Sequence, residues 1–263
     1  IEEFQKLGGI CFNDEVDFGK AFVNMMDTFS CTDDNYIYGD IDHNSIRSIV
    51  RNAANGYLKP QEVSMLLDAA GICRVREFVA CTLQEALDDA SDIGYPLVMK
   101  VVGPLHKTDG GVVLNITDDE MLGKEFIRMM NIKGAEAVLL QPMLSGTELF
   151  VGAKKEQNFG TQVLCGLGGI FVEALGDVSS NLAPFSTRTA LNMIKTLKGY
   201  KIIEGIRGKE GVNEVIFAEM VSRVSSLCTI APEIVEMDIN PLLGNLTSVV
   251  AVDARIRIEK YNG

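Results

Sequence analysis

Hydrophobic positions recur at helical or strand spacing along most of the chain. Apolar residues three or four positions apart predict helices over 17–29, 45–54, 60–70, 82–93, 117–130, 187–197 and 212–231. β-Branched or alternating runs predict strands over 75–80, 95–102, 111–116, 137–141, 148–154, 161–165, 234–239 and 249–258, with shorter ones at 10–12 and 170–173. The runs at 137–165 are spaced as an antiparallel sheet. This order of elements predicts an α+β fold rather than a doubly wound parallel one.

The hydrophobic pattern also divides the chain. Residues 1–31 read as a small helix–strand–helix unit, in which Phe18, Ala21, Phe22, Met25 and Met26 share one helix face. Residues 32–45 are polar and read as a linker. Residues 46–263 then form the main domain.

Composition narrows the functional classes. The chain has 263 residues, 47% of them apolar, and a formal net charge of −12. Such a surface disfavours general binding to nucleic acid or anionic lipid, although a local nucleotide site remains compatible with it. We find no apolar run of membrane-spanning length and no signal-peptide layout. The six cysteines form no C-x-x-C pair, so we expect reduced, mostly buried thiols in a cytoplasmic protein.

The segment 96–113 has the most distinctive chemistry. An apolar strand ends at Lys100, a turn carries His106, and Gly110 and Gly111 precede a second strand. A fixed cation, flexible backbone N–H donors and a nucleophilic imidazole within one hairpin are suited to handling phosphate.

Oxygen-bearing side chains gather near the end of the chain. Asp238 and Asn240 lie in the run 236–241, and Asp253 lies in the run 252–254. Carboxylate and amide oxygens are the ligands that Mg²⁺ prefers. Together with the His106 loop they suggest a nucleotide enzyme that passes phosphate through His106.

Several longer motifs carry a family resemblance. They are Leu-His-Lys-Thr-Asp-Gly-Gly at 105–111, Gln-Pro-Met-Leu-Ser-Gly-Thr-Glu-Leu-Phe-Val-Gly at 141–152, Gly-Leu-Gly-Gly-Ile-Phe-Val-Glu at 166–173, Asp-Ile-Asn-Pro at 238–241 and Val-Asp-Ala-Arg-Ile at 252–256. In this order they strongly resemble the ATP-grasp domain of the ADP-forming acyl-CoA synthetases, relatives of succinyl-CoA synthetase. Residues 1–31 resemble the end of the CoA-ligase domain that precedes the ATP-grasp domain in fused members, so we expect this chain to be part of a longer enzyme.

The resemblance implies an ATP-grasp fold and the reaction acyl-CoA + ADP + phosphate ⇌ acid + ATP + CoA, with an acetate-like acyl group. It implies that His106 relays the phosphoryl group between a second histidine and ADP. It assigns the nucleotide to Lys100, Gly110, Gly111, Gln141, Pro142, Met143 and Glu148, and Mg²⁺ to Asp238, Asn240 and Asp253. ATP, ADP and phosphate would bind here, whereas CoA and the acyl group would bind to other domains, and we expect an oligomer. The family's histidine loop usually has one more residue before the glycine pair; here Asp109 precedes Gly110 directly.

Two alternatives remain open from the residues. One is a regulatory acyl-CoA synthetase-like module of a protein acetyltransferase, which binds a ligand without turnover. The other is an ATP-grasp ligase that uses an acyl phosphate directly, without a phosphohistidine.

Overall fold

The chain forms two compact units, residues 1–35 and 36–263. The computed structural model describes residues 3, 6, 11–12, 14–29, 38–103, 110–156, 158–169, 176–206, 208 and 210–260, with side chains left out for 24–29. The first unit contains helix α2 (Glu15–Phe29), which begins two residues before its predicted start. The Phe18 ring packs against those of Phe12 and Phe22, and all three side chains are exposed.

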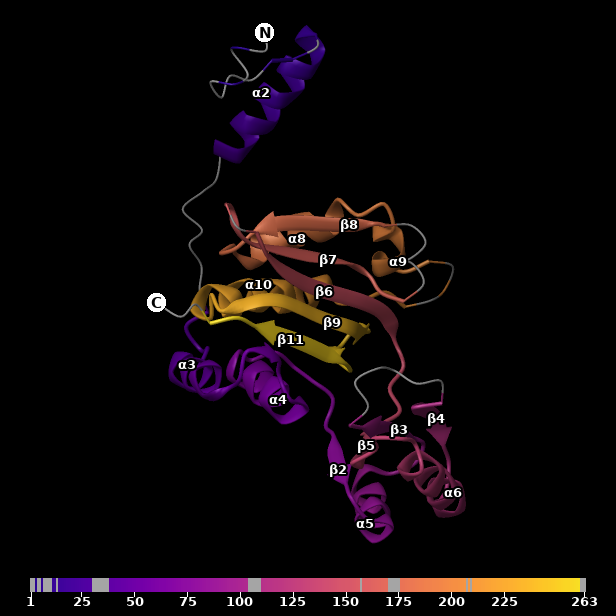
Figure 1. The fold of residues 1–263 in the computed structure, drawn as a ribbon. Helices are drawn as coiled ribbons and strands as arrows, with labels where there is room; N and C mark the ends of the chain where they lie inside the picture. The colour runs from indigo at the N-terminus through magenta and orange to yellow at the C-terminus, as the bar shows by residue number, and fades with distance from the viewer. Residues whose placement is uncertain are drawn as a thin grey trace. The chain divides into compact units, whose positions relative to one another are not determined.

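A seven-stranded antiparallel sheet organises the second unit (Figure 1). Its strand order is β1-β11-β9-β6-β7-β8, and β10 pairs with β9. The strands are β1 (Gly56–Tyr57), β6 (Thr147–Glu156), β7 (Gly160–Leu167), β8 (Val178–Leu182), β9 (Ile234–Gly244), β10 (Val249–Ala251) and β11 (Ala254–Ile258).

Helices cover one face of this large sheet. They are α3 (His43–Asn52), α4 (Pro60–Ala69), α8 (Thr187–Lys195), α9 (Tyr200–Glu204) and α10 (Glu214–Ile230). Their apolar sides bury Leu149, Val151 and Ala153 of β6 together with Met237 and Ile239 of β9. Because side chains alternate along a strand, Glu148, Asp238 and Asn240 point to the opposite face.

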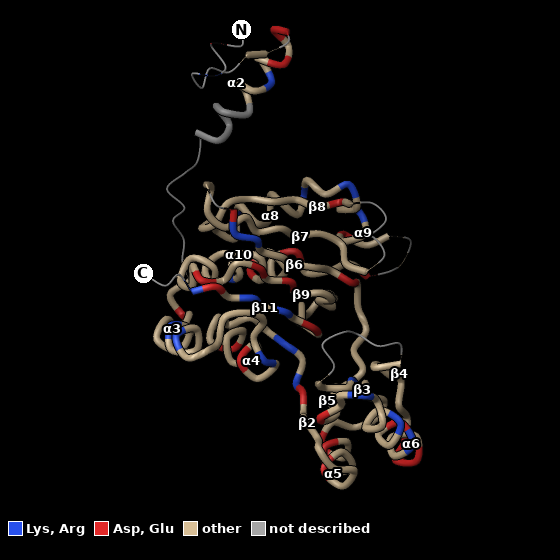
Figure 2. The backbone as a smooth tube through the Cα atoms, in the orientation of Figure 1, with Lys and Arg blue, Asp and Glu red and all other residues tan. Residues whose placement is uncertain are grey.

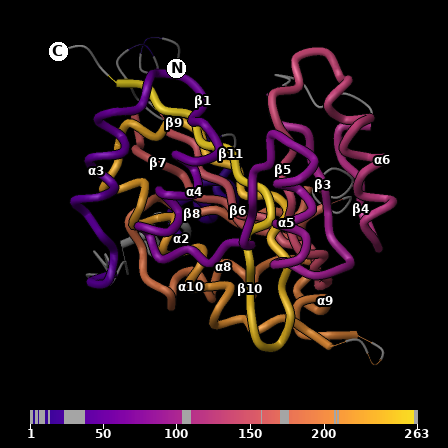
Figure 3. The backbone as a smooth tube through the Cα atoms, turned by 90° about the horizontal axis from the view of Figure 1, so that it is seen from below, coloured from indigo at the N-terminus to yellow at the C-terminus, as the bar shows by residue number. Residues whose placement is uncertain are grey.

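A four-stranded sheet forms a second, smaller core. Its order is β2-β5-β3-β4, made of β2 (Phe78–Ala80), β3 (Leu97–Val102), β4 (Val112–Ile116) and β5 (Ala137–Pro142). One face packs on α5 (Leu83–Ile93) and α6 (Asp119–Met130) through Leu97, Met99, Val138 and Leu140. In Figure 3, β3, β4, β5 and α6 lie together.

The α+β class and most predicted elements are confirmed, but one strand pairing and the bounds of two strands differ from the prediction. The strand predicted over 137–141 belongs to the small sheet, not with 148–154 and 161–165. The strand predicted over 249–258 is interrupted at Val252 and Asp253, and β7 extends through Leu167. Three elements, β1, β8 and α9, had no predicted counterpart. The strand predicted over 170–173 lies outside the described residues.

Two further expectations concern thiols and membranes. Buried thiols are fewer than predicted, since Cys11, Cys73 and Cys81 are exposed and only Cys165 and Cys228 are buried among the described cysteines. None of the helices in the described ranges is long and apolar enough to cross a membrane.

Charges of both signs lie along β9 and β11 (Figure 2). Arg255 is opposite Asp238, and Arg257 is opposite Glu236, in the strand register. Opposite charges that face each other across antiparallel strands stabilise the pairing modestly. On this part of the sheet two arginines thus face two acidic residues, although the sequence as a whole carries a net negative charge.

Candidate functional site

The small sheet directs Lys100 and Gln141 toward the loop between β10 and β11. In the register of β3 and β5, Val98 is opposite Gln141 and Lys100 is opposite Leu139, so these four residues share one sheet face. The other face is the one packed on α5 and α6. The core therefore determines which way Lys100 and Gln141 point.

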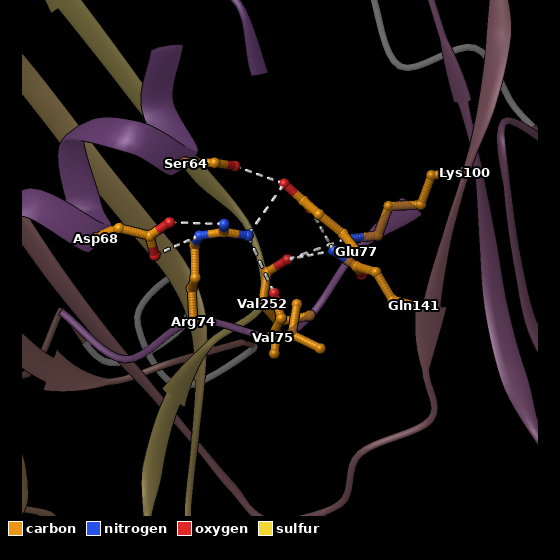
Figure 4. Close-up of polar contacts among 8 residues, drawn as sticks. All are labelled: Ser64, Asp68, Arg74, Val75, Glu77, Lys100, Gln141 and Val252. Carbon is orange, nitrogen blue, oxygen red and sulfur yellow. Dashed lines mark hydrogen bonds and ion pairs between the residues drawn. The ribbon is translucent and has the colours of Figure 1, made fainter. Parts of the chain in front are cut away.

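Two donors from the small sheet converge on one carbonyl. Lys100 Nζ and Gln141 Nε2 each lie 3.2 Å from the Val252 carbonyl oxygen (Figure 4). Val252 occupies the break between β10 and β11, and its own N–H donates to the Pro241 carbonyl at 3.0 Å. This contact joins the small sheet to the segment that carries Asp253.

Asp253 lies beside Asn240. The Asn240 N–H donates to the Asp253 carbonyl at 3.1 Å, and Asp238 precedes Asn240 by two positions on the uncovered face of β9. The three residues predicted as metal ligands therefore come from the middle of β9 and from the break between β10 and β11. Within the described ranges, no three His, Cys, Asp or Glu side chains gather as they would around a metal ion. A cation here would thus need the Asn240 amide together with the two carboxylates, which is an all-oxygen donor set that fits Mg²⁺.

Glu148 lies at the start of β6, against a glycine turn. Its carbonyl accepts a hydrogen bond from the Gly168 N–H at 2.7 Å. Gly169 has a φ of +58°, and a Cβ atom there would overlap the Glu148 carboxylate. The absence of a side chain at Gly169 therefore leaves room for this exposed acid, whereas a Cβ atom at Gly168 would meet the backbone of Leu149.

The remaining predicted nucleotide residues border the small sheet. Gly110 has a φ of +87°, and its carbonyl accepts from Arg128 Nη2 at 2.8 Å. The buried Gly111 bonds through its carbonyl to the Val101 N–H at 2.9 Å. Pro142 ends β5, and the Met143 N–H donates to the Pro96 carbonyl at 3.1 Å. His106 lies outside the described residues, as does all of 104–109, and its role remains a prediction.

The structure brings some of these residues together and leaves others apart. Lys100 and Gln141 meet at Val252, next to Asp253 and Asn240. No hydrogen bond or ion pair of the described residues joins Glu148 to this group. The predicted site residues thus come from both sheets, and their joint action on one ligand remains a prediction.

A partly exposed polar network next to Gln141 was not predicted. Gln141 Nε2 donates to Glu77 Oε2 at 3.0 Å, and Ser64 Oγ donates to Glu77 Oε1 at 2.6 Å. Arg74 Nη1 lies 3.7 Å from Glu77 Oε1, and Arg74 is paired twice, at 2.8 Å each, with Asp68 (Figure 4). These bonds raise the pKa of Arg74, chiefly through Asp68. The charged residues Arg74, Arg76 and Glu77 were the available signal, but residues 75–80 were interpreted as a strand.

Comparison with known proteins places this geometry in context. A family model described as ATP-grasp domain matches residues 49–258. The beta subunit of acetate–CoA ligase (ADP-forming) I from Pyrococcus furiosus is 41% identical over 216 residues, which cover 78% of this chain and 93% of that subunit. Acetate–CoA ligase (ADP-forming) I from Archaeoglobus fulgidus is 38% identical over 73% of this chain, which spans only 29% of that enzyme.

A solved structure is also similar. It is dinucleotide forming acetyl-coenzyme A synthetase 1 of Ca. Korarchaeum cryptofilum, in complex with coenzyme A and Mg-AMPPCP, with its phosphohistidine segment pointing towards the nucleotide binding site. The identity is 31% and the TM-score 0.71, over 83% of this chain and all of that one.

Proposed function

Because this chain belongs to the ATP-grasp family of ADP-forming acetate–CoA ligases, we propose that it is the nucleotide-binding, phosphoryl-transfer part of such an enzyme. The complete reaction would be acyl-CoA + ADP + phosphate ⇌ acid + ATP + CoA. The observation that carries the proposal is the convergence of Lys100 and Gln141 on Val252, beside Asp253 and Asn240. The proposal thus combines a cation from the small sheet with oxygen-bearing side chains of the large sheet that would hold the metal.

Each residue has a distinct task in this proposal. The Lys100 ammonium binds phosphate oxygens, and backbone N–H groups at Gly110 and Gly111 lie over them. The segment Gln141–Met143 lies beside the base, and Glu148 accepts hydrogen bonds from the ribose hydroxyls. All of these are donors or acceptors of the type that a nucleoside di- or triphosphate requires.

Asp238, Asn240 and Asp253 would hold Mg²⁺. When bound, the ion neutralises charge on the phosphate oxygens. The three side chains supply oxygen atoms only, and two of them are carboxylates, in keeping with the preference of Mg²⁺.

His106 would carry the phosphoryl group. In the direction of histidine phosphorylation, a neutral imidazole nitrogen attacks the terminal phosphorus of ATP, the bond to the bridging oxygen breaks, and ADP leaves. In the reverse direction ADP attacks the phosphohistidine. A neutral imidazole is a competent nucleophile near neutral pH.

The other substrates belong to the rest of the enzyme. The chain spans less than a third of the Archaeoglobus fulgidus relative, and we propose that CoA and the acyl group bind to parts outside it. We also propose a cytoplasmic, oligomeric enzyme.

Labelling with ATP carrying radioactive terminal phosphate tests the proposal. The chain with Mg²⁺ should acquire acid-labile, base-stable label, and His106→Asn should abolish it. His43→Asn is the matched control, because the chain has two histidines and His43 is exposed at the start of α3. It should label like the wild type.

The outcomes separate the alternatives. The proposal would be contradicted if the chain bound nucleotide but acquired no label, and if the complete enzyme formed no ATP from acetyl-CoA, ADP and phosphate. That pair of results would favour a regulatory module. ATP formation that survives His106→Asn in the complete enzyme would instead favour a ligase without a phosphohistidine.

A further inference from the structure

A recess outside the proposed nucleotide site carries an excess of positive charge. It has a volume of about 290 Å³ and lies where α3, the end of β6, the connection between α10 and β9, and the residues after β11 meet. Its lining residues are Arg47, Arg51, Lys155, Pro232, Glu233 and Lys260. Four cations against one carboxylate leave this basic recess with a net charge of +3, in a chain whose net charge is −12.

Another recess shows that such an excess is not general. It is lined by Asp68 and by residues 71–77, and it contains Arg74 and Arg76 together with Asp68 and Glu77. Two cations are therefore matched there by two carboxylates, and Arg74 is paired directly with Asp68 at 2.8 Å. The basic recess lacks this balance.

Two ammonium groups of the basic recess are held in place by backbone carbonyls. Lys155 Nζ donates to the Pro232 carbonyl at 2.7 Å. Lys260 Nζ donates to the carbonyls of Arg51 and Ala53 at the end of α3. A carbonyl oxygen accepts an N–H group but has no full charge, so these bonds orient the ammonium groups without neutralising them.

The two arginines of α3 differ in their partners. Arg47 Nη1 and Nη2 donate to the two oxygens of Glu233, so the one carboxylate of the basic recess is already paired. Arg51 follows Arg47 by four positions and therefore lies on the same side of the helix. Its guanidinium is exposed and has no ion pair or hydrogen bond with the described residues. A ligand in the recess would thus meet this guanidinium directly.

The basic recess is separate from the residues assigned to the nucleotide. Lys155 follows Glu148 by seven positions on β6, which corresponds to about 23 Å along an extended strand. Lys155 shares the helix-covered face of the sheet with Ala153, whereas Glu148 points to the opposite face. An anion in the basic recess would therefore be a second ligand of the chain.

We propose that the basic recess binds inorganic phosphate through Arg51, Lys155 and Lys260. Phosphate is a small oxyanion that is mainly doubly charged near neutral pH, so it offsets the mutual repulsion of the three cations. The planar guanidinium of Arg51 presents paired N–H donors that match two phosphate oxygens, and the ammonium groups act as point charges beside them. This site does not depend on the proposed nucleotide function.

Thermal unfolding of the full chain at increasing concentrations of inorganic phosphate tests the proposal, with chloride at matched ionic strength as the reference. Phosphate should raise the melting temperature above that reference, because a ligand that binds only the folded chain stabilises it. The concentration dependence gives the dissociation constant. Arg51→Gln and Lys155→Gln should each weaken phosphate binding about fivefold.

Arg188→Gln is the matched control. It removes the same charge from an exposed position on α8, outside the basic recess, and should leave phosphate binding unchanged. Since Arg51 is exposed and has no partner among the described residues, Arg51→Gln should keep the fold intact, and its melting temperature in chloride checks this.

Three results would overturn the proposal. Equal stabilisation by phosphate and chloride at matched ionic strength would mean general screening of charge. Equal weakening by Arg188→Gln and Arg51→Gln would mean an effect of net charge. Phosphate binding that survives Arg51→Gln but is lost in Lys100→Gln would place the anion in the proposed nucleotide site instead.

Discussion

At the residue scale, the position of the Glu148 carboxylate depends on Gly169 having no side chain. We expect Gly169→Ala to displace the carboxylate and to weaken MgADP binding about tenfold, since a lost charged hydrogen bond costs at least ~1.5 kcal/mol. The measurement is a calorimetric titration.

Gly176→Ala is the matched control for this change. Gly176 has a similar φ of +55°, but a Cβ atom there would meet no atom of the described residues within 4 Å, whereas at Gly169 it meets Glu148. Both variants should lose about 1 kcal/mol of stability from the left-handed backbone. If both weaken binding equally, Gly169 has no specific effect on Glu148.

Thiol reactivity is a second property of single residues. Burial raises the pKa of the Cys165 and Cys228 thiols to about 12. Because the thiolate is the reactive form, both should resist alkylation in the native state, while the exposed Cys11, Cys73 and Cys81 react. Mass spectrometry after iodoacetamide treatment measures this, and rapid modification of Cys165 in the folded chain would contradict the burial described here.

At the element scale, an ion pair ties α3 to the connection between α10 and β9. Arg47 Nη1 and Nη2 lie 2.6 and 2.7 Å from the two oxygens of Glu233. The hydrogen bonds from Arg47 hold the pKa of Glu233 below its ordinary value of 4.5. We expect Arg47→Met to lower the free energy of unfolding by about 1 kcal/mol at neutral pH.

The pH dependence of that loss follows from the sign of the shift. A carboxylate whose pKa is depressed on folding contributes stability above its ordinary pKa, and the contribution fades as the pH falls through the folded value. Urea unfolding at neutral pH and at about pH 3 should therefore show the two proteins converging in acid. Arg51→Met on the same helix is the control, because Arg51 forms no ion pair with the described residues; an equal loss there would argue against the pair.

At the scale of the whole molecule, the two sheets have separate cores and meet through the contacts of Lys100 and Gln141 with Val252. If nucleotide and metal bind between them, MgADP should stabilise the folded chain. At a concentration about 100-fold above its dissociation constant, the gain would be about 2.7 kcal/mol. Thermal unfolding with MgADP, and with ADP plus EDTA, measures the share that depends on the metal.

The variant Asp253→Asn tests the part of the stabilisation by MgADP that depends on the metal. It should lose most of the metal-dependent gain, because a neutral amide replaces a carboxylate ligand, while it leaves the Asn240 N–H to Asp253 carbonyl bond intact. If EDTA does not alter the stabilisation by ADP, the assignment of Asp238, Asn240 and Asp253 to Mg²⁺ is wrong.

The sequence by itself determined which face of the helices α4 and α10 is buried, whereas the apolar face predicted for α2 is exposed at Phe18 and Phe22. Val63, Leu66 and Leu67 on α4, and Met220, Val224 and Leu227 on α10, are buried as their spacing predicted. Local periodicity is enough for this, because a helix or strand shows its buried face in its own sequence. The motifs also identified the family.

Only the tertiary structure decided which strands pair and what surrounds the site. The strand at 137–142 joins Lys100 in the small sheet, and the break at Val252 and Asp253 brings the two sheets into contact. The contact of Glu77 with Gln141 joins residues that are 64 positions apart in the sequence. Such partners are chosen by packing between distant segments, which local patterns do not encode.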